Sequence, residues 1–321
     1  MTRYARQTLL PEVGAKGQAQ MSSTRVLVVG AGGLAASVLP LLAGAGVGRI
    51  TIVDGDIVDL SNLHRQTLFS EVDCGYPKSE IAADRCRSLN SNIEVFGQKQ
   101  TLTSENVATF VTQADVVLDC ADSYAASYIL SDTCLAQSKP LISASVLGLS
   151  GYVGGFCGGA PSLRALFPDA PDSGASCATA GVLGPVVTTI GAMQAQMAMN
   201  LILGLDPSPL GQMVQYDART LHSSGFRFDE APEPDSCFRF LTASQLIAND
   251  QIVELRGTDE APTPAHPDAI RISPENLDKI DPNKGKRLAL CCATGLRAWR
   301  AAELLQPDWP GEIVLVAAST S

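Results

Sequence analysis

The stretch GAGGLA, Gly30 to Ala35, directly follows the apolar run RVLVV, Arg25 to Val29. A short β-branched run that ends in glycine is typical of a buried parallel strand. The stretch matches the pattern G-x-G-x-x-A at a turn from a strand into a helix, where backbone N–H groups and the helix N-terminus favour a phosphate. The sequence therefore predicts a nucleotide site whose loop is formed by Gly30, Gly32 and Gly33.

Strand-like and helix-like patterns alternate after this loop. The sequence predicts further strands over residues 49–54, 93–98, 114–120 and 140–144, and helices between them over 33–45, 78–89 and 124–137. Strands that alternate with helices form a parallel sheet with helices on both faces. We therefore expect an α/β fold of the Rossmann type, with a doubly wound and mainly parallel sheet.

The pattern restarts after DEAPEPD at residues 229–235, an acidic and proline-rich segment that is typical of a linker. Beyond it the sequence predicts a small α/β unit, with a helix at 243–249, strands at 252–255, 287–291 and 312–316, and a helix at 297–305. We expect a first domain over residues 1–228, a linker over 229–242 and a second domain over 243–321.

Composition limits the classes of function. The 321-residue chain carries 23 basic and 33 acidic residues, a net charge of −10, which makes it a poor partner for nucleic-acid phosphates. The N-terminal segment lacks the apolar stretch of a signal peptide, and Pro185, Gln194 and Asn200 interrupt the longest apolar region, 181–205, so a buried helix fits better than a membrane span. The nine cysteines then indicate thiols of a cytoplasmic protein rather than a disulfide framework.

Several polar residues after the loop favour chemistry at a phosphate. Asp54 ends the second strand, where it can accept hydrogen bonds from ribose hydroxyls. Asn62, Arg65 and Gln66 follow it, and Lys78 begins the next helix. An NAD-dependent oxidoreductase, which the glycine loop alone would also fit, does not need these cations, whereas attack at an α-phosphate does, because negative charge grows there.

The segment DCADS at residues 119–123 places Asp122 at the end of another predicted strand. A carboxylate there can hold Mg²⁺ through its hard oxygen atoms. Each of these residues also has a plain structural interpretation. Arg65 and Lys78 can form surface ion pairs, and Asp122 can cap the helix that follows.

These segments together resemble the ThiF/MoeB family, the bacterial relatives of ubiquitin-activating enzymes. They occur in the family's order within about residues 3–225, as RYARQ at 3–7 and as segments 30–35, 54–66, 75–78, 119–123 and 177–185. The resemblance implies a homodimer in which Arg6 reaches the triphosphate of the neighbouring subunit. It also implies that Asp54 binds ribose, that Asn62, Arg65 and Lys78 bind phosphates, and that Asp122 binds Mg²⁺.

The chain departs from the family at the zinc site. The family usually carries two C-x-x-C pairs, one just before Leu-Phe-Pro and one near the end of the first domain. Here Ser162 and Ala165 stand at the first pair, and only Cys237 is present at the second. Without soft thiolate ligands we do not expect zinc.

Two cysteines are candidate nucleophiles. Cys177 lies in a segment rich in Gly and Ser before an apolar helix, and a thiolate there can attack an acyl-adenylate; its alternative is a small loop hydrophobe. Cys292 opens CATGLR, residues 292–297, between a strand and a helix, where successive N–H groups form an anion-binding nest and Arg297 adds a positive charge. This segment resembles the active loop of rhodaneses. We expect the other cysteines in or beside predicted elements to be packing residues, namely Cys74, Cys86, Cys120, Cys134 and Cys157.

The resemblance implies an adenylyltransferase with sulfurtransferase activity. With ATP and Mg²⁺ it would adenylate the C-terminal carboxylate of a ubiquitin-like sulfur-carrier protein that ends in Gly-Gly. Sulfur from a persulfide donor, such as a cysteine desulfurase, would then give a thiocarboxylate. The alternative is a nucleotide-bound dimeric docking module for a ubiquitin-like protein, with an inactive rhodanese domain.

Overall fold

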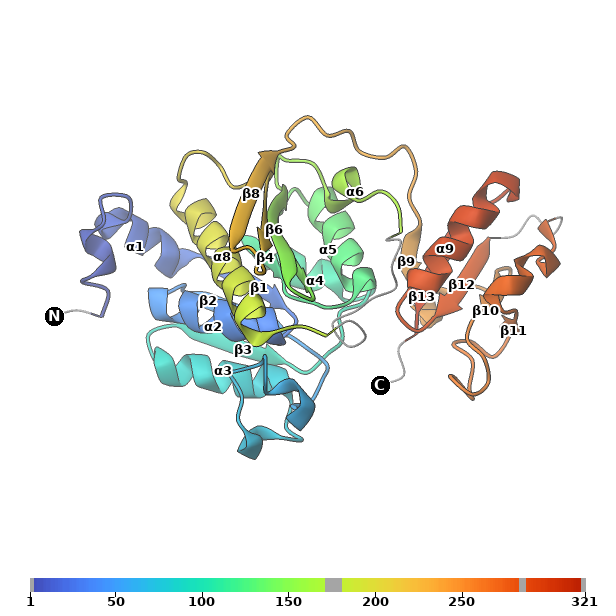
Figure 1. The fold of residues 1–321 in the computed structure, drawn as a ribbon, viewed down its shortest axis with the longest axis horizontal. Coiled ribbons are helices and arrows are strands. Elements are labelled where there is room, and N and C mark those ends of the chain that lie inside the picture. The colour runs from blue at the N-terminus through green and yellow to red at the C-terminus, as the bar shows by residue number, and fades with distance from the viewer. Residues whose placement is uncertain (1–2, 171–180, 283–286, 319–321) are drawn as a thin grey trace.

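The computed structural model describes residues 3–170, 181–282 and 287–318. Its larger sheet has the strand order β3-β2-β1-β4-β5-β6-β7-β8 (Figure 1). The strands of this sheet are β1 (Arg25–Val29), β2 (Arg49–Val53), β3 (Glu94–Gln98), β4 (Val116–Asp119), β5 (Pro140–Leu147), β6 (Ser150–Cys157), β7 (Gln212–Asp217) and β8 (His222–Arg227). Its helices are α1 (Gly14–Ser23), α2 (Gly33–Ala45), α3 (Lys78–Leu89), α4 (Val107–Thr112), α5 (Tyr124–Ala136), α6 (Leu163–Leu166) and α8 (Gly184–Leu203).

The strands from β3 to β5 are parallel, and β1 lies between β2 and β4. Their apolar residues are buried because helices cover both faces of the sheet. The carboxyl ends of β1, β2 and β4 therefore meet at one edge, where ligands bind in sheets of this kind. The structure confirms the predicted α/β fold and the helices predicted at 33–45 and 78–89.

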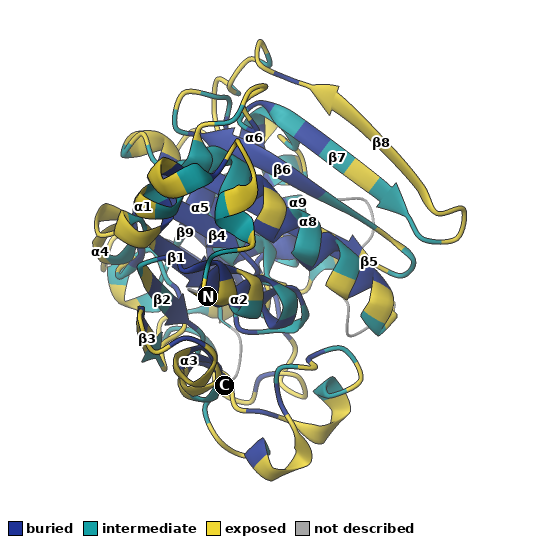
Figure 2. Ribbon diagram, turned by 90° about the vertical axis from the view of Figure 1, so that its left-hand side faces the viewer, coloured by how far each residue is buried: buried dark blue, intermediate teal, exposed yellow. Residues whose placement is uncertain are grey.

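The strands β6, β7 and β8 extend the sheet in antiparallel fashion beyond β5. The sequence did not predict them. β6 is largely buried, whereas every residue of the edge strand β8 is exposed (Figure 2). Half-exposed and glycine-containing strands lack the apolar run that identified the parallel strands.

Among the described residues, one helix, α8, is long and apolar enough to cross a membrane. It packs against α2 and against the strands β5 and β6, and Ile190, Ala195 and Ala198 belong to the core on that side of the sheet. This burial agrees with the prediction of a core helix.

The second sheet has the order β11-β10-β12-β13-β9, and all its strand pairs are parallel. Its elements are β9 (Arg239–Leu241), β10 (Gln251–Glu254), β11 (Ile270–Arg271), β12 (Leu288–Cys292), α9 (Leu296–Leu305) and β13 (Ile313–Ala317). Short 3₁₀ helices occur at Gln7–Leu9, Leu60–Asn62, Glu71–Asp73, Ala243–Gln245, Pro274–Lys279 and Gln306–Asp308. β9 lies within the predicted linker, so the second sheet begins before residue 243.

The predicted helix at 243–249 is wrong. Only Ala243–Gln245 is helical, as a single 3₁₀ turn. The Thr242 and Gln245 side chains close this turn with a capping box, and the Asp250 carboxylate then accepts a hydrogen bond from the Ile247 backbone at 2.8 Å. These local bonds replace the next helical turn.

The two sheets share one continuous cluster of buried apolar side chains. At its centre the ring of Tyr128 on α5 lies 4.5 Å from the ring of Trp299 on α9 in an edge-on arrangement. The guanidinium of Arg164 on α6 lies 4.8 Å from the Tyr128 ring centroid and 5.6 Å from that of Trp299. The second unit is therefore packed on the first rather than only tethered to it.

Candidate functional site

The glycine loop connects β1 to α2 and lies against the residues that follow β4. Gly30 has φ +89°, and a Cβ at this position would lie 2.6 Å from the carbonyl oxygen of Cys120. Its N–H donates to the Val53 carbonyl at 2.9 Å, which ties the loop to β2 as well. Only glycine combines this backbone conformation with so close an approach. The N-terminus of α2 follows at Gly33 and favours an anion in front of it.

Asp54 lies beside this loop. Its Oδ2 accepts a hydrogen bond from the Ala31 N–H at 2.6 Å, and its Oδ1 accepts one from the Asp56 N–H at 2.8 Å. Burial raises the pKa of Asp54 above its ordinary value, and these hydrogen bonds work against that shift. The carboxylate is thus fixed at the carboxyl end of β2, next to the nest of N–H groups.

The segment that contains Asn62, Arg65 and Gln66 lies against the other face of the loop. A Cβ on Gly33 would lie 3.4 Å from the Arg65 carbonyl, and one on Gly32 would lie 3.6 Å from Gln66 Nε2. Gln66 Nε2 donates to Asn62 Oδ1 at 2.9 Å. The other amide atom, Gln66 Oε1, is buried without a hydrogen-bond partner among the described residues. A buried orphan acceptor is costly, which suits a site completed by a ligand with a donor group.

Lys78 supplies the second cation of this edge. It is 6% exposed, and its Nζ lies 3.0 Å from the carboxylate of Asp56, which is itself largely exposed. The charge of Lys78 also lowers the pKa of Asp54, although burial dominates at that carboxylate. The ammonium group is therefore within electrostatic range of Asp54 at this edge of the sheet and is paired with the exposed carboxylate of Asp56.

The turn from β4 to α5 carries Asp122. Ser123, rather than Asp122, is the N-cap residue of α5. The preceding Asp119 is fully buried and accepts hydrogen bonds from Ser143 Oγ at 2.8 Å and from the Ala121 N–H at 3.1 Å. Burial raises the pKa of Asp119 to about 6. Asp119 shapes the turn that presents Asp122.

Gln194 was missed by sequence reasoning. It lies on α8, and its buried Nε2 donates to the carbonyls of Asp119 at 2.7 Å and Ile142 at 3.0 Å, while its Oε1 accepts from Cys120. The amide thereby fixes the end of β4. A polar residue inside an apolar helix was the available signal.

The structure does not bring Arg6 to this edge within one chain. Arg6 is exposed, and the nearby Tyr4 lies against Gly46, which caps the far end of α2. That helix has 13 residues and so spans about 20 Å. Cys177, the candidate nucleophile of the first domain, lies outside the described residues.

Cys292 and Arg297 lie at the carboxyl end of the second sheet. The buried Sγ of Cys292 accepts hydrogen bonds from the N–H groups of Gly295 at 3.1 Å and Ala298 at 3.4 Å. Gly295 has φ +88° and forms the N-cap of α9. The predicted nest is therefore present, with its N–H groups directed at the sulfur. The neighbouring Cys291 is also buried, and burial raises the pKa of its thiol to about 12.

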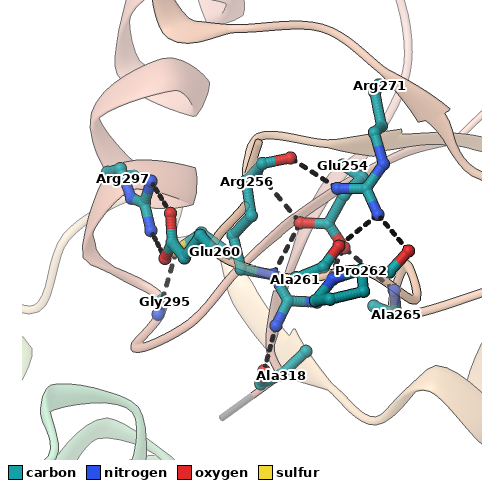
Figure 3. Close-up of polar contacts among 11 residues, drawn as sticks. Glu254, Arg256, Glu260, Ala261, Pro262, Ala265, Arg271, Gly295, Arg297 and Ala318 are labelled. Carbon is teal, nitrogen blue, oxygen red and sulfur yellow. Dashed lines mark hydrogen bonds and ion pairs between the residues drawn. The ribbon is translucent and has the colours of Figure 1, made fainter. Parts of the chain in front are cut away.

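A second loop borders this nest and begins with Glu254, at the end of β10 (Figure 3). Glu254 is fully buried and accepts two hydrogen bonds from the guanidinium of Arg256, at 2.8 and 2.7 Å, and one from the Ala265 N–H at 2.9 Å. Burial works to raise the pKa of Glu254, but these bonds outweigh it and leave the pKa below its usual value.

Glu254→Gln is expected to lower the free energy of unfolding by about 3 kcal/mol at pH 7, because it leaves the buried Arg256 charge unpaired. The pKa of Glu254 is lower in the folded protein than in the unfolded chain. Its ionised carboxylate therefore stabilises the fold above the pKa of the unfolded chain, and this stabilisation is lost as the pH falls through the folded pKa. The difference between variant and wild type should therefore shrink below about pH 4. Denaturant titration of both proteins measures this difference in the free energy of unfolding. Glu312→Gln, which removes an exposed pair with Arg239, should cost at most about 1 kcal/mol; equal losses for both variants would contradict this assignment.

The residues at the positions of the family's zinc ligands make direct contacts instead. Ser162 donates from its N–H and its Oγ to the Glu233 carboxylate, at 2.6 and 2.5 Å. Arg164, which lies between the two positions of the first pair, donates to Asp132 at 2.6 and 2.9 Å and to the Phe238 carbonyl at 3.0 Å. Cys237 is exposed. No three His, Cys, Asp or Glu side chains in the described part of the chain are grouped to hold a metal ion.

Comparison with known proteins gives matches over most of the chain. The model of the ThiF family matches residues 4–237. Adenylyltransferase and sulfurtransferase MOCS3 of Culex quinquefasciatus is 39% identical over 267 residues, which are 81% of this chain and 60% of that protein. SAMP-activating enzyme E1 of Haloferax volcanii is 37% identical over 239 residues, which are 74% of this chain and 88% of that protein. The chain spans about 60% of the length of the MOCS3 relatives.

A solved structure of Escherichia coli MccB with ATP has the same fold as the first sheet and its helices. It aligns with a TM-score of 0.64 at 21% identity and covers 74% of each chain.

Proposed function

Since the chain belongs to the ThiF family, we propose that it uses ATP to adenylate the C-terminal glycine carboxylate of a ubiquitin-like sulfur-carrier protein. The observation that carries this proposal is the meeting of the glycine loop, Asp54, the Arg65–Gln66 segment and Lys78 at one edge of the sheet. The similarity to proteins named adenylyltransferases and to a SAMP-activating enzyme supports it.

The residues of this edge fit ATP. The N–H groups of the loop and the start of α2 suit its phosphates, and Asp54 suits the ribose hydroxyls. Gln66 Oε1 is buried without a hydrogen-bond partner among the described residues, so it would accept a hydrogen bond from a donor group of the ligand. Mg²⁺ is usually bound by one or two carboxylates together with substrate phosphates, so Asp122 would hold it and the ion would neutralise phosphate charge.

In the proposed reaction a carboxylate oxygen of the carrier attacks the α-phosphorus of ATP. The bond from that phosphorus to the leaving pyrophosphate breaks, and the carrier becomes an acyl-adenylate. Lys78 exchanges the Asp56 carboxylate for a phosphate oxygen, and Arg65 stabilises the same growing charge. Arg6 acts from the neighbouring subunit of a homodimer.

We assign sulfur transfer to the rhodanese-like second unit. A persulfide donor, such as a cysteine desulfurase, loads Cys292 with a terminal sulfur atom. That sulfur attacks the acyl carbon and AMP leaves, which gives an acyl disulfide. Attack by a second thiol on the Cys292 sulfur releases the thiocarboxylate and forms a disulfide with Cys292; Cys177 is the candidate for this thiol. We place the reaction in the cytoplasm, without membrane or nucleic-acid partners.

Pyrophosphate exchange tests the adenylation step. The probes are ubiquitin-like proteins that end in Gly-Gly, including any that is co-encoded with this chain, with radiolabelled pyrophosphate and ATP. We expect exchange that requires the carrier and that disappears when the terminal glycine of the carrier is removed. ATP binding without exchange for any co-encoded carrier would refute the proposal.

A further inference from the structure

Two neutral ion pairs involve the loop that borders the Cys292 nest. Arg256 is paired with Glu254 at 2.7 Å, and both are buried. Arg297 donates two hydrogen bonds to the carboxylate of Glu260, and both of these side chains are about two-fifths exposed (Figure 3). The two pairs therefore have no net charge, and the outer pair faces solvent.

The loop from Cys292 to Gly295 carries no lysine, arginine, aspartate or glutamate. Ala293 and Thr294 separate Cys292 from Gly295, and the two N–H groups that reach the sulfur come from Gly295 and Ala298. Arg297 lies in the first turn of α9, directly before Ala298, whose N–H reaches the sulfur. The hydrogen bonds that Arg297 donates to Glu260 raise the pKa of Arg297 most, and a thiolate at Cys292 would raise it further.

Glu260 is held in place by the loop that carries it. Arg271 donates to the carbonyls of Arg256, at 2.7 Å, of Ala261 and of Pro262, at 3.2 Å. These bonds hold the backbone on both sides of Glu260, and the Glu260 carboxylate is paired with Arg297.

The charge of the sulfur donor matters at such a nest. A Cys292 thiolate that attacks a persulfide, R–S–S⁻, breaks the donor S–S bond, takes the terminal sulfur and, with one proton taken up, releases R–SH. Attack on thiosulfate takes its outer sulfur and releases sulfite. The second reaction brings a dianion to a thiolate, a total charge of −3, and needs a free cation close to the sulfur.

Resting on the sulfur transfer proposed above, we propose that Glu260 restricts the Cys292 site to persulfide donors and excludes thiosulfate by neutralising Arg297. Glu260 touches neither sulfur atom in this scheme. It is a positioning residue that sets which class of donor the site accepts.

The test compares two donors on the full-length protein. Cys292 persulfide is measured by mass spectrometry as one added sulfur atom, after addition of either thiosulfate or cysteine persulfide. Glu260→Gln keeps the shape of the side chain and an oxygen that accepts a hydrogen bond from Arg297, but it removes the negative charge. We expect the rate with thiosulfate to rise about tenfold, mainly through a lower KM, while the rate with cysteine persulfide changes less than about twofold. The gain should shrink at high salt, because salt screens this half-exposed pair.

Two further variants separate charge from structural damage. Glu312→Gln removes the exposed pair with Arg239 at the N-terminal end of β13 and should leave both rates unchanged. In the double variant Glu260→Gln with Arg297→Gln this pair of positions again has no net charge. The rate with thiosulfate relative to the rate with cysteine persulfide should therefore return close to the wild-type value.

An unchanged ratio in Glu260→Gln, with normal loading from cysteine persulfide, would overturn the role of Glu260 and leave the proposed function intact. A wild-type protein that takes sulfur from neither donor would overturn the proposed sulfur transfer together with this inference.

Discussion

Lys78→Met is expected to lower carrier-dependent pyrophosphate exchange by about 100-fold or more. Lys78 is almost completely buried, and among the described residues its ammonium group forms an ion pair with the exposed carboxylate of Asp56. The cation is therefore available to a phosphate at the edge where the glycine loop and Asp54 meet. Methionine fills a similar volume, so the fold is retained while the stabilisation of charge at the α-phosphate is lost.

The matched control is Lys279→Met. Lys279 is exposed at the end of the 3₁₀ helix Pro274–Lys279 in the second unit, and its replacement should leave exchange unchanged. ATP affinity, measured by calorimetry, should weaken much less than the rate falls in Lys78→Met. An exchange rate within about threefold of wild type would remove Lys78 from the proposed reaction.

The parallel half of the first domain was predictable because its strands are short, apolar and separated by helices. The motif from Gly30 to Ala35 fixed the position of the first turn, and the spacing to Asp54 identified the end of β2. Local sequence patterns carry this information, since each element buries a run of residues that can be read directly. The boundaries of α2 and α3 were correct for the same reason.

The antiparallel strands and the contacts between the two units were not predictable. β8 is exposed along its whole length, so it has no apolar pattern. The hydrogen bonds from Ser162 to Glu233 join residues 71 positions apart, and the contact between Tyr128 and Trp299 joins the two units. Long-range contacts of this kind leave no periodic signal in the sequence.

The candidate site at the carboxyl edge of the first sheet contains residues that the sequence predicted and residues that it did not. The candidates Asp54, Gln66 and Lys78 followed from motif spacing. The groups that orient the edge, Asp119 and Gln194, did not, because their contacts join segments far apart in the sequence: Asp119 accepts from Ser143 Oγ, and Gln194 donates to the Asp119 carbonyl. Sequence reasoning identifies residues by their type and spacing, whereas the supporting hydrogen bonds depend on how distant segments pack.

Cys292→Ala should abolish thiocarboxylate formation, with a loss of at least about 1,000-fold, and should leave pyrophosphate exchange within about twofold of wild type. The reason is the position of the sulfur. Two N–H groups are directed at Cys292 Sγ, and such a nest stabilises a thiolate or a persulfide anion. The nucleotide edge belongs to the other sheet, so its chemistry does not use this thiol. The measurement is the mass of the carrier after reaction with ATP and a persulfide donor.

Cys291→Ala is the control that makes this result specific. Cys291 precedes Cys292 on the same strand and is equally buried, but it belongs to a separate apolar cluster, and burial raises the pKa of its thiol to about 12. A thiol of that kind stays protonated and is a poor nucleophile. Cys291→Ala should therefore retain thiocarboxylate formation, at the cost of a small loss of stability. An unchanged yield of thiocarboxylate in Cys292→Ala would mean that the second unit only binds the carrier. A loss of that yield in Cys291→Ala alone would mean that Cys291, and not Cys292, carries the sulfur.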